Sequence, residues 1–220
     1  MSTADSWPQE DEPAYGDDEE LPGFEEDDDL EDEPELEPYE DEDSAGEPPQ
    51  LAGHAPGELA IPDDVHALQG VPHAPGRGVG IVVSRFNGDV TNRLLESALA
   101  ELDRVGFPRE RVTVMPVPGA FELPLGAMAL AKSRRYACVV ALGCVIRGET
   151  AHFDYVAGEA ASGIQLAGLE TGVPVAFGVL TVDTLEQAMA RADKGGEAVR
   201  GALEMADLFS QLRAASSSRG

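Results

Sequence analysis

The sequence predicts an α/β fold with three layers, in which a four-stranded parallel sheet carries helices on both faces. From about residue 78 to residue 212, short apolar runs alternate with segments whose apolar residues recur at helical spacing. A parallel sheet covered on both sides is the arrangement that buries the apolar faces of such alternating elements. The preceding residues differ in composition and predict a disordered acidic tail.

The formal net charge of −27 is concentrated at the N-terminal end of the 220-residue chain. Residues 1–60 hold 24 of the 42 acidic residues, and the first basic residue is Arg77. Repulsion between like charges, with few apolar groups to offset it, predicts an acidic disordered N-terminal extension over residues 1–60 and a linker over residues 61–77. An alternative is that the extension contains a docking peptide built from Leu21, Phe24, Leu30, Leu36 and Tyr39.

Composition argues against several classes of function. Residues 61–220 carry 18 acids against 15 bases, so a basic face for nucleic acid is not expected. No apolar run reaches membrane-spanning length, and no signal peptide is evident, so we expect a cytoplasmic protein with no membrane partner. Cys138 and Cys144 lie in an apolar run, which indicates buried thiols rather than a disulfide or a metal site.

The first half of the domain is expected to contain two strands and two helices. Residues 80–84 read as a buried strand, and the turn at residues 87–89 leads into a helix over residues 90–105. Asp89 is the expected N-cap of that helix, and Gly106 ends it. The second strand covers residues 112–117, and the second helix covers residues 121–133 with Pro124 in its first turns.

The second half repeats this alternation. Residues 137–146 form the longest apolar strand, and a third helix opens at Thr150 or Ala151 and runs to about residue 172. Glycines inside a helix reduce its stability, so close packing is the expected reason for Gly158, Gly163 and Gly168. A fourth strand covers residues 173–180. Thr184 then begins a fourth helix, with Gln187 placed to complete a capping box. A final helix over residues 196–212 precedes a frayed C-terminus, residues 213–220.

Ligands of open parallel sheets bind beyond the carboxyl ends of the strands. This rule selects the loops at residues 84–89, 116–122, 145–152 and 180–184. The third loop carries the most chemistry.

In that third loop, Gly148 permits a backbone conformation closed to other residues, and the N–H groups of Glu149 and Thr150 precede a helix, where an anion can bind. His152 lies one turn away, and an imidazole suits proton transfer near neutral pH. The alternative is a capped helix with a surface histidine.

The other loops offer candidates that each have a simpler alternative. Phe86 either stacks on a flat heteroaromatic ring or covers the core. Glu122 either accepts hydrogen bonds from ligand hydroxyls or complements the helix dipole. Arg191, on or just past the fourth helix, either binds phosphate or is an exposed helix-end cation, and Lys194 allows the same two interpretations.

Five segments together resemble the 6,7-dimethyl-8-ribityllumazine synthase family. They are GIVVSRFN (residues 80–87), VPGAFE (117–122), LGCVIRGETAHFDYV (142–156), GVPVAFG (172–178) and ALEMA (202–206). The resemblance covers about residues 78–212, in order and at the family's spacing, and leaves the acidic extension outside it.

The resemblance implies a flavodoxin-like fold and a transferase-class activity in riboflavin biosynthesis. The reaction condenses 5-amino-6-(D-ribitylamino)uracil with 3,4-dihydroxy-2-butanone 4-phosphate, releases phosphate and water, and needs no cofactor or metal. His152 would transfer protons. The implied substrate-binding residues are Phe86 for the pyrimidinedione ring, Ala120, Phe121 and Glu122 for the ribityl chain, Cys144, Val145 and Ile146 for the ring edge, Glu149, Thr150 and Arg191 for the phosphate, and Phe177 to close the pocket.

The resemblance also implies a homo-oligomer. Family members are pentamers with sites shared between neighbours, so Phe86, Glu122 and His152 of one chain would face Phe177 and Arg191 of the next. Members that form icosahedral shells carry a longer connection after the arginine, whereas residues 191–197 are short here. We therefore expect a pentamer or paired pentamers, leave the role of Lys194 open, and regard riboflavin synthase as a candidate partner.

Two other functions remain open at the level of sequence. One is a non-catalytic homologue that binds a lumazine or flavin or serves as a scaffold, although the retained His152, Glu122 and Arg191 argue against it. The other is a flavodoxin-like receiver domain, although the first loop lacks the acidic cluster that such domains use for metal.

Overall fold

The structure is a computed structural model that describes residues 59–73 and 76–217. Most of the predicted acidic extension, including the docking-peptide residues, lies outside the described residues. The last three residues of the predicted frayed C-terminus also lie outside them.

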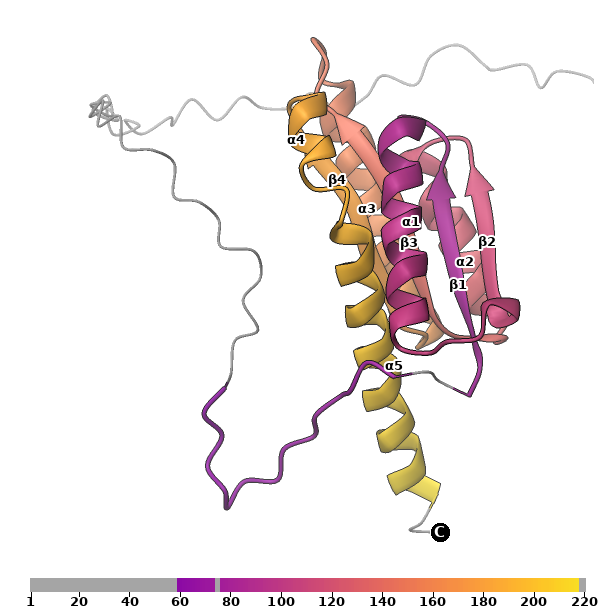
Figure 1. The fold of residues 1–220 in the computed structure, drawn as a ribbon, viewed down its shortest axis with the longest axis vertical. Coiled ribbons are helices and arrows are strands. Elements are labelled where there is room, and N and C mark those ends of the chain that lie inside the picture. The colour runs from indigo at the N-terminus through magenta and orange to yellow at the C-terminus, as the bar shows by residue number, and fades with distance from the viewer. Residues whose placement is uncertain (1–58, 74–75, 218–220) are drawn as a thin grey trace, which may run out of the picture. The chain divides into compact units, whose positions relative to one another are not determined.

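Strands and helices alternate along the described chain, as the sequence predicts. In chain order they are β1 (Gly78–Ser84), α1 (Gly88–Arg104), η1 (Arg109–Arg111), β2 (Val112–Val117), η2 (Ala120–Glu122), α2 (Leu123–Lys132), β3 (Tyr136–Ile146), α3 (His152–Thr171), β4 (Val175–Val182), α4 (Leu185–Met189) and α5 (Lys194–Ser217). The four strands form one parallel sheet in the order β2-β1-β3-β4, which confirms the predicted fold class (Figure 1). Among the described helices, none is long and apolar enough to cross a membrane.

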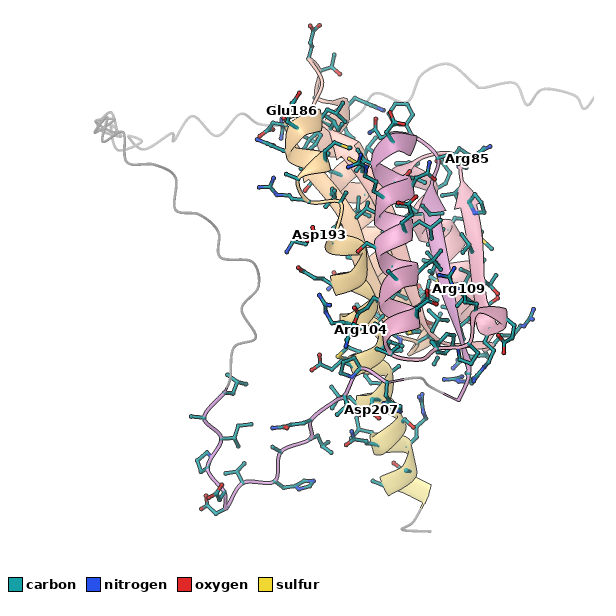
Figure 2. The ribbon with its side chains drawn as sticks, viewed as in Figure 1. Arg85, Arg104, Arg109, Glu186, Asp193 and Asp207 are labelled. Atoms are coloured by element: carbon teal, nitrogen blue, oxygen red, sulfur yellow. The ribbon has the colours of Figure 1, made fainter. Side chains whose placement is uncertain are left out.

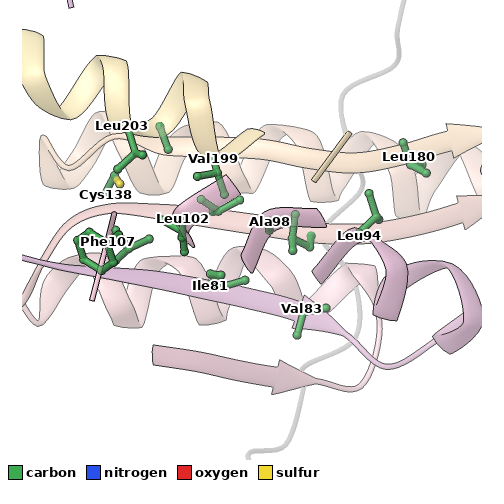
Figure 3. Packing of buried hydrophobic residues seen from close by; sticks show 14 of the residues in the cluster. Ile81, Val83, Leu94, Ala98, Leu102, Phe107, Cys138, Leu180, Val199 and Leu203 are labelled. Atoms are coloured by element: carbon green, nitrogen blue, oxygen red, sulfur yellow. The ribbon is translucent and has the colours of Figure 1, made fainter. Parts of the chain in front are cut away.

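Helices cover both faces of the sheet. On one face, α1 and α5 pack side by side, and their apolar residues join one side of the strands in a buried cluster (Figures 1 and 3). On the other face, α2 and α3 pack together and bury the opposite side of the strands. Successive strand residues therefore serve different clusters: Ile81 and Val83 face α1 and α5, whereas Val82 faces α2 and α3.

β3 lies between β1 and β4 and is buried along almost its whole length. This position explains its continuous apolar sequence, since both of its faces contact helices. The thiols of Cys138 and Cys144 are free and buried, as predicted. Burial raises the pKa of Cys138 to about 12 and that of Cys144 to about 11.

Several predicted helix ends are wrong. Asp89 is not the cap of α1, because the chain turns two residues earlier, at Asn87, whose φ of 57° is left-handed. The second helix starts with the 3₁₀ turn η2 rather than as an α-helix. Its Pro124 lies in the first turn of α2, as predicted. The final helix, α5, begins at Lys194 and continues to Ser217, five residues beyond the predicted end at Leu212.

Other predicted ends are confirmed. The backbone N–H of Gln187 donates to Thr184 Oγ1 (3.2 Å), so Thr184 caps α4. The Gln187 side chain completes the cap one residue earlier than expected, because it accepts from the N–H of Asp183 (2.9 Å) rather than of Thr184.

Residues 59–73, which include most of the linker predicted over residues 61–77, form no helix or strand, and the C-terminal part of this segment contacts α5. The N–H of Val71 donates to Asp207 Oδ2 (3.0 Å), and the Gln211 side chain donates to the carbonyl of Gln69 (2.9 Å). Figure 2 labels Asp207 on α5. These bonds hold residues 69–71 against the helix.

The glycines of α3 differ in their surroundings. A Cβ on Gly163 would lie 2.7 Å from Pro124 Cβ, so the predicted close packing is confirmed there. Gly168 has ordinary van der Waals space, and no described atom lies within 4 Å of a Cβ on Gly158, so close packing does not explain Gly158 within the described chain.

We predict that Gly163→Ala destabilises the fold by about 1–3 kcal/mol, because the rigid proline ring cannot move out of the way of a methyl group. Gly201→Ala is the matched control, since its Cβ would meet nothing within 4 Å in the interior of α5. That change should leave stability unaltered or raise it by up to about 1 kcal/mol. Urea unfolding of the two variants tests this, and equal midpoints would contradict the packing argument.

A buried carboxylate links α1 to α5. The Glu101 residue is 6% exposed, and its carboxylate accepts from Arg104 Nε (3.0 Å) and Nη2 (2.6 Å) and from Arg200 Nη1 (3.1 Å). Figure 2 labels Arg104 at this helix pair. The hydrogen bonds from Arg104, assisted by Arg200, lower the pKa of Glu101 below its ordinary value of 4.5.

The lowered pKa means that Glu101 stabilises the fold above its unfolded-state pKa, and that this contribution is lost as the pH falls through the folded-state value. We predict that Glu101→Gln lowers the free energy of unfolding at pH 7 by about 1–3 kcal/mol and makes it less dependent on pH below about 4.5. Glu96→Gln on the exposed side of α1 is the control. Urea unfolding at pH 7, 5 and 3.5 measures both effects, and parallel pH profiles for the two variants would refute the prediction.

Candidate active site

The candidate site lies where β3 continues past β1. β3 pairs with β1 only as far as Val83 and Leu142, but it pairs with β4 as far as Ile146 and Val182. Residues 143–146 therefore have a strand on one side and a cavity of about 820 Å³ nearby. From β1 the chain continues to β2 on one side of β1, whereas β3 lies on the other side. The end of β1 is therefore the switch point of the strand order, where open parallel sheets bind ligands.

Three of the four predicted loops contribute to this cavity. The loops after β1, β2 and β3 all line it, and nine of the predicted site residues lie in its wall: Phe86, Ala120, Phe121, Glu122, Cys144, Val145, Ile146, Thr150 and His152. The loop after β4, at residues 180–184, does not line it. The strand order explains this difference, because β4 lies on the side of β3 that faces away from β1.

Hydrogen bonds hold the first loop in place. The N–H of Arg85 donates to the carbonyl of Val117 (2.8 Å), and the N–H of Phe86 donates to that of Pro118 (3.1 Å). The Asn87 side chain donates to the carbonyl of Cys144 (2.9 Å) and so links this loop to β3. Asn87 was not among the predicted site residues, although an Asn-Gly pair after a strand is typical of a left-handed turn.

Two phenyl rings are exposed at the cavity. Phe86 is 69% exposed and Phe121 is 58% exposed, and both line the wall. Phe86 therefore does not cover the core, which excludes the simpler interpretation of this residue. Exposed aromatic rings beside a cavity are suited to stack on a flat ligand.

Glu122 both lines the cavity and stabilises its own loop. Its Oε2 accepts from the N–H of Gly119 (2.9 Å), which closes the turn η2. The carboxylate is thus held at the wall by a backbone bond. Contact with ligand hydroxyls remains a prediction.

The third loop provides backbone donors at the start of a helix. α3 begins at His152, and no side chain accepts from its first turn in the manner of an N-cap. Among described residues, the N–H groups of Glu149 and Thr150 have no acceptor, while the N–H of His152 is 3.4 Å from Thr150 Oγ1. Gly148 does not have the predicted positive φ, so the donors do not depend on a special glycine conformation.

Donors at a helix start, with the helix dipole behind them, form an anion site. Thr150 and His152 both line the cavity beside these donors, whereas Glu149 does not. The arrangement can therefore hold an anion next to a group able to transfer protons.

The remaining predicted residues lie away from the cavity of their own chain. Phe177, on β4, is 45% exposed and pairs with Ala141. Arg191 follows α4, and its Nη1 donates to the carbonyl of Gln187 (3.0 Å). Lys194 begins α5 and contacts Glu197 at 2.6 Å. None of the three lines the cavity.

The first turns of α3 supply wall residues that sequence analysis missed. Phe153, Tyr155 and Val156 all line the cavity. Tyr155 and Val156 follow His152 by three and four positions, which places them on the same face of the helix. The helical spacing from His152 could therefore have identified Tyr155 and Val156 from the sequence.

The described part of the chain offers no set of side chains that could bind a metal ion. Residues 59–73 and 76–217 contain no group of three His, Cys, Asp or Glu side chains able to hold a metal ion. The polar side chains at the cavity are instead the Glu122 carboxylate, the Asn87 amide, the Thr150 and Tyr155 hydroxyls, the Cys144 thiol and the His152 imidazole, beside the backbone donors.

Comparison with known proteins relates the chain to a family. The sequence model for 6,7-dimethyl-8-ribityllumazine synthase matches residues 76–210. The chain is 52% identical over 153 residues to a protein of that name from Edwardsiella ictaluri. The aligned residues cover 67% of this chain and 98% of the relative. It is also 52% identical over 144 residues to one from Syntrophus aciditrophicus, which covers 63% of this chain and 94% of the relative.

Proposed function

The chain belongs to the 6,7-dimethyl-8-ribityllumazine synthase family, and from that premise we propose that the cavity beyond β1, β2 and β3 is its active site. The enzyme condenses 5-amino-6-(D-ribitylamino)uracil with 3,4-dihydroxy-2-butanone 4-phosphate in riboflavin biosynthesis. The observation that supports this site best is the joint placement of an exposed aromatic ring, free backbone donors and a histidine around one cavity.

The pyrimidinedione ring is proposed to bind between Phe86 and the free edge of β3. The exposed phenyl ring offers a stacking surface, and residues 143–146 have no β1 partner. Backbone groups of Cys144, Val145 and Ile146 can therefore meet the polar edge of the ring. The Cys144 carbonyl already accepts from Asn87, so that bond holds the loop that carries Phe86 against β3.

The ribityl chain is proposed to lie along the second loop. Ala120 and Phe121 line the wall there, and Glu122 supplies a carboxylate that can accept from hydroxyl groups. The bond from Gly119 holds that carboxylate in position before substrate arrives.

The phosphate of the second substrate is proposed to bind at the start of α3. The N–H groups of Glu149 and Thr150 are the donors, and the helix dipole favours negative charge. No lysine or arginine stands among the described residues that line the cavity. A cation from another chain would complete this subsite.

The chemistry consists of condensation and elimination steps. An amine of the pyrimidine attacks the ketone, water leaves to give an imine, and phosphate is eliminated. The second amine nitrogen then attacks the remaining carbonyl and closes the ring with loss of a second water. Each step moves protons, and His152 lies in the wall beside the phosphate donors where it can transfer them. Holding both substrates in one cavity replaces a collision between two molecules with a reaction inside one complex.

The missing cation and the exposed apolar surface both support an oligomeric site. Arg191 and Phe177 lie outside their own cavity, and we propose that they complete the site of a neighbouring chain. Large apolar side chains are exposed on α2 and α3: Leu125 and Leu169 are each 75% exposed. Apolar surface of this kind is typical of a protein interface.

We propose a pentamer, alone or paired, rather than an icosahedral shell. The connection between α4 and α5, which is longer in shell-forming members, is short here: α4 ends at Met189 and α5 begins at Lys194. The proposed setting is the cytoplasm, with riboflavin synthase as the proposed protein partner. The acidic N-terminal segment would add like charge to the surface of any larger shell.

Light scattering of the full chain should give a mass of about 116 kDa, which is five chains of 23.2 kDa, or twice that value. The number of chains per particle should stay the same when residues 1–60 are deleted, at a correspondingly lower mass, with turnover unchanged. A particle on the order of a megadalton would refute the pentamer proposal, and a large loss of turnover on deletion would show that the acidic segment serves catalysis.

His152→Ala should slow formation of the lumazine by about 10²–10⁴-fold, because the proton-transfer group is lost, and should leave the oligomer mass unchanged. Product is followed by lumazine absorbance and fluorescence after both substrates are mixed with the protein. The control is His66→Ala in the exposed linker, which should retain full activity.

Full activity of His152→Ala would remove His152 from its proposed role. Absence of product with the unaltered chain would instead favour the non-catalytic binding or scaffold homologue.

A further inference from the structure

Arg147 connects three elements beside the proposed phosphate subsite. It follows β3 directly, and its N–H donates to the carbonyl of Val182 at the end of β4 (2.8 Å). Its Nε donates to Asp183 Oδ1 (3.2 Å), and its Nη1 donates to Asp154 Oδ1 (3.1 Å) in the first turn of α3. The guanidinium also lies over the ring of Phe153, 4.0 Å from the ring centre.

The ring of Phe153 fixes the guanidinium between the two carboxylates. Phe153 lines the cavity and packs against the buried cluster beneath α2 and α3, so its position is set by the core. A cation held over an aromatic face gains further attraction. Arg147 itself does not line the cavity, so it acts on the site through its neighbours.

One carboxylate lies close to the proposed phosphate donors along the chain, and the other is linked to their loop through Arg147. Asp154 comes two residues after His152 and four after Thr150, and Asp183 is held to Arg147, which starts the same loop. Negative charge beside an anion subsite opposes the binding of a dianion. The guanidinium neutralises one of these charges and reduces the effect of the other.

We propose that Arg147 is a positioning residue that shields the phosphate subsite from the carboxylates of Asp154 and Asp183. This rests on the proposed function. The shield raises the affinity for the phosphorylated substrate, whereas binding of the pyrimidine, which carries no phosphate, between Phe86 and residues 144–146 depends little on these charges.

If Arg147 only stabilised the fold, its loss would lower the melting temperature. The Arg147, Asp154 and Asp183 side chains are 46%, 60% and 67% exposed, and ion pairs at such exposure add little to stability. Loss of Arg147 should therefore leave the melting temperature nearly unchanged while it alters substrate binding.

The test compares KM for the two substrates in the full-length protein. Arg147→Gln should raise KM for 3,4-dihydroxy-2-butanone 4-phosphate about tenfold and leave KM for the pyrimidine within about twofold. The rise should shrink as KCl is increased from about 50 to 500 mM, because salt screens the carboxylates. The matched control is Arg109→Gln, which removes a guanidinium bonded to Asp103 (Nε to Oδ1, 2.8 Å) away from the cavity and should change neither KM (Figure 2).

Removal of the carboxylates provides the rescue. In Arg147→Gln combined with Asp154→Asn and Asp183→Asn, KM for the phosphorylated substrate should return to within about threefold of the unaltered enzyme. A triple variant as impaired as Arg147→Gln alone would overturn the proposal, and so would equal rises in both KM values. Failure of the proposed function is distinguishable, because the unaltered chain would then form no lumazine at all.

Discussion

The projection of β3 beyond β1 is the constraint on which the rest of the site depends. β1 turns away at Ser84 toward the loop of β2, while β3 continues to Ile146 with only β4 as its partner. Residues 144–146 at the free edge form one wall, and the bond from Asn87 to Cys144 holds the loop after β1 against this edge. α3 can then begin close to the first two loops, which brings His152 and Thr150 to the same cavity. Burial of β3 on both faces keeps this edge rigid.

Much of the fold could be predicted from the sequence because the spacing of apolar residues indicates which faces of a strand or helix are buried. β3 is apolar on both faces and α1 alternates at helical spacing, so these elements were placed within one or two residues. Helix ends were less predictable, since several local bonds compete for the same donors. Asn87 adopts a left-handed conformation and starts α1 before Asp89 is reached, and the carboxylate of Glu122 closes a 3₁₀ turn before α2 begins. Such choices depend on contacts between loops, which spacing in one segment does not contain.

The site followed from the sequence only in part, for a topological reason. The rule that ligands bind at carboxyl ends of strands treats all four loops alike, but the cavity uses the three that surround the switch between β1 and β3. Strand order therefore decides which loops meet, and that order arises from long-range packing. Asn87, Phe153, Tyr155 and Val156 were missed because each contributes through geometry between elements rather than through an evident reactive group.

The distribution of charge separates recognition of the two substrates. The described cavity wall contains aromatic rings, backbone donors and a carboxylate but no lysine or arginine, so one chain already presents what a neutral ring and its hydroxylated chain require. The phosphate requires cations, but Arg147 lies behind the wall over Phe153, and Arg191, after α4, lies outside the cavity of its own chain. Under the proposed function, affinity for the phosphorylated substrate is therefore linked to assembly, because the neighbouring chain supplies the arginine. Under the same proposal, a single chain would retain the ring subsite but lack the complete phosphate subsite, so catalysis would depend on subunit contact.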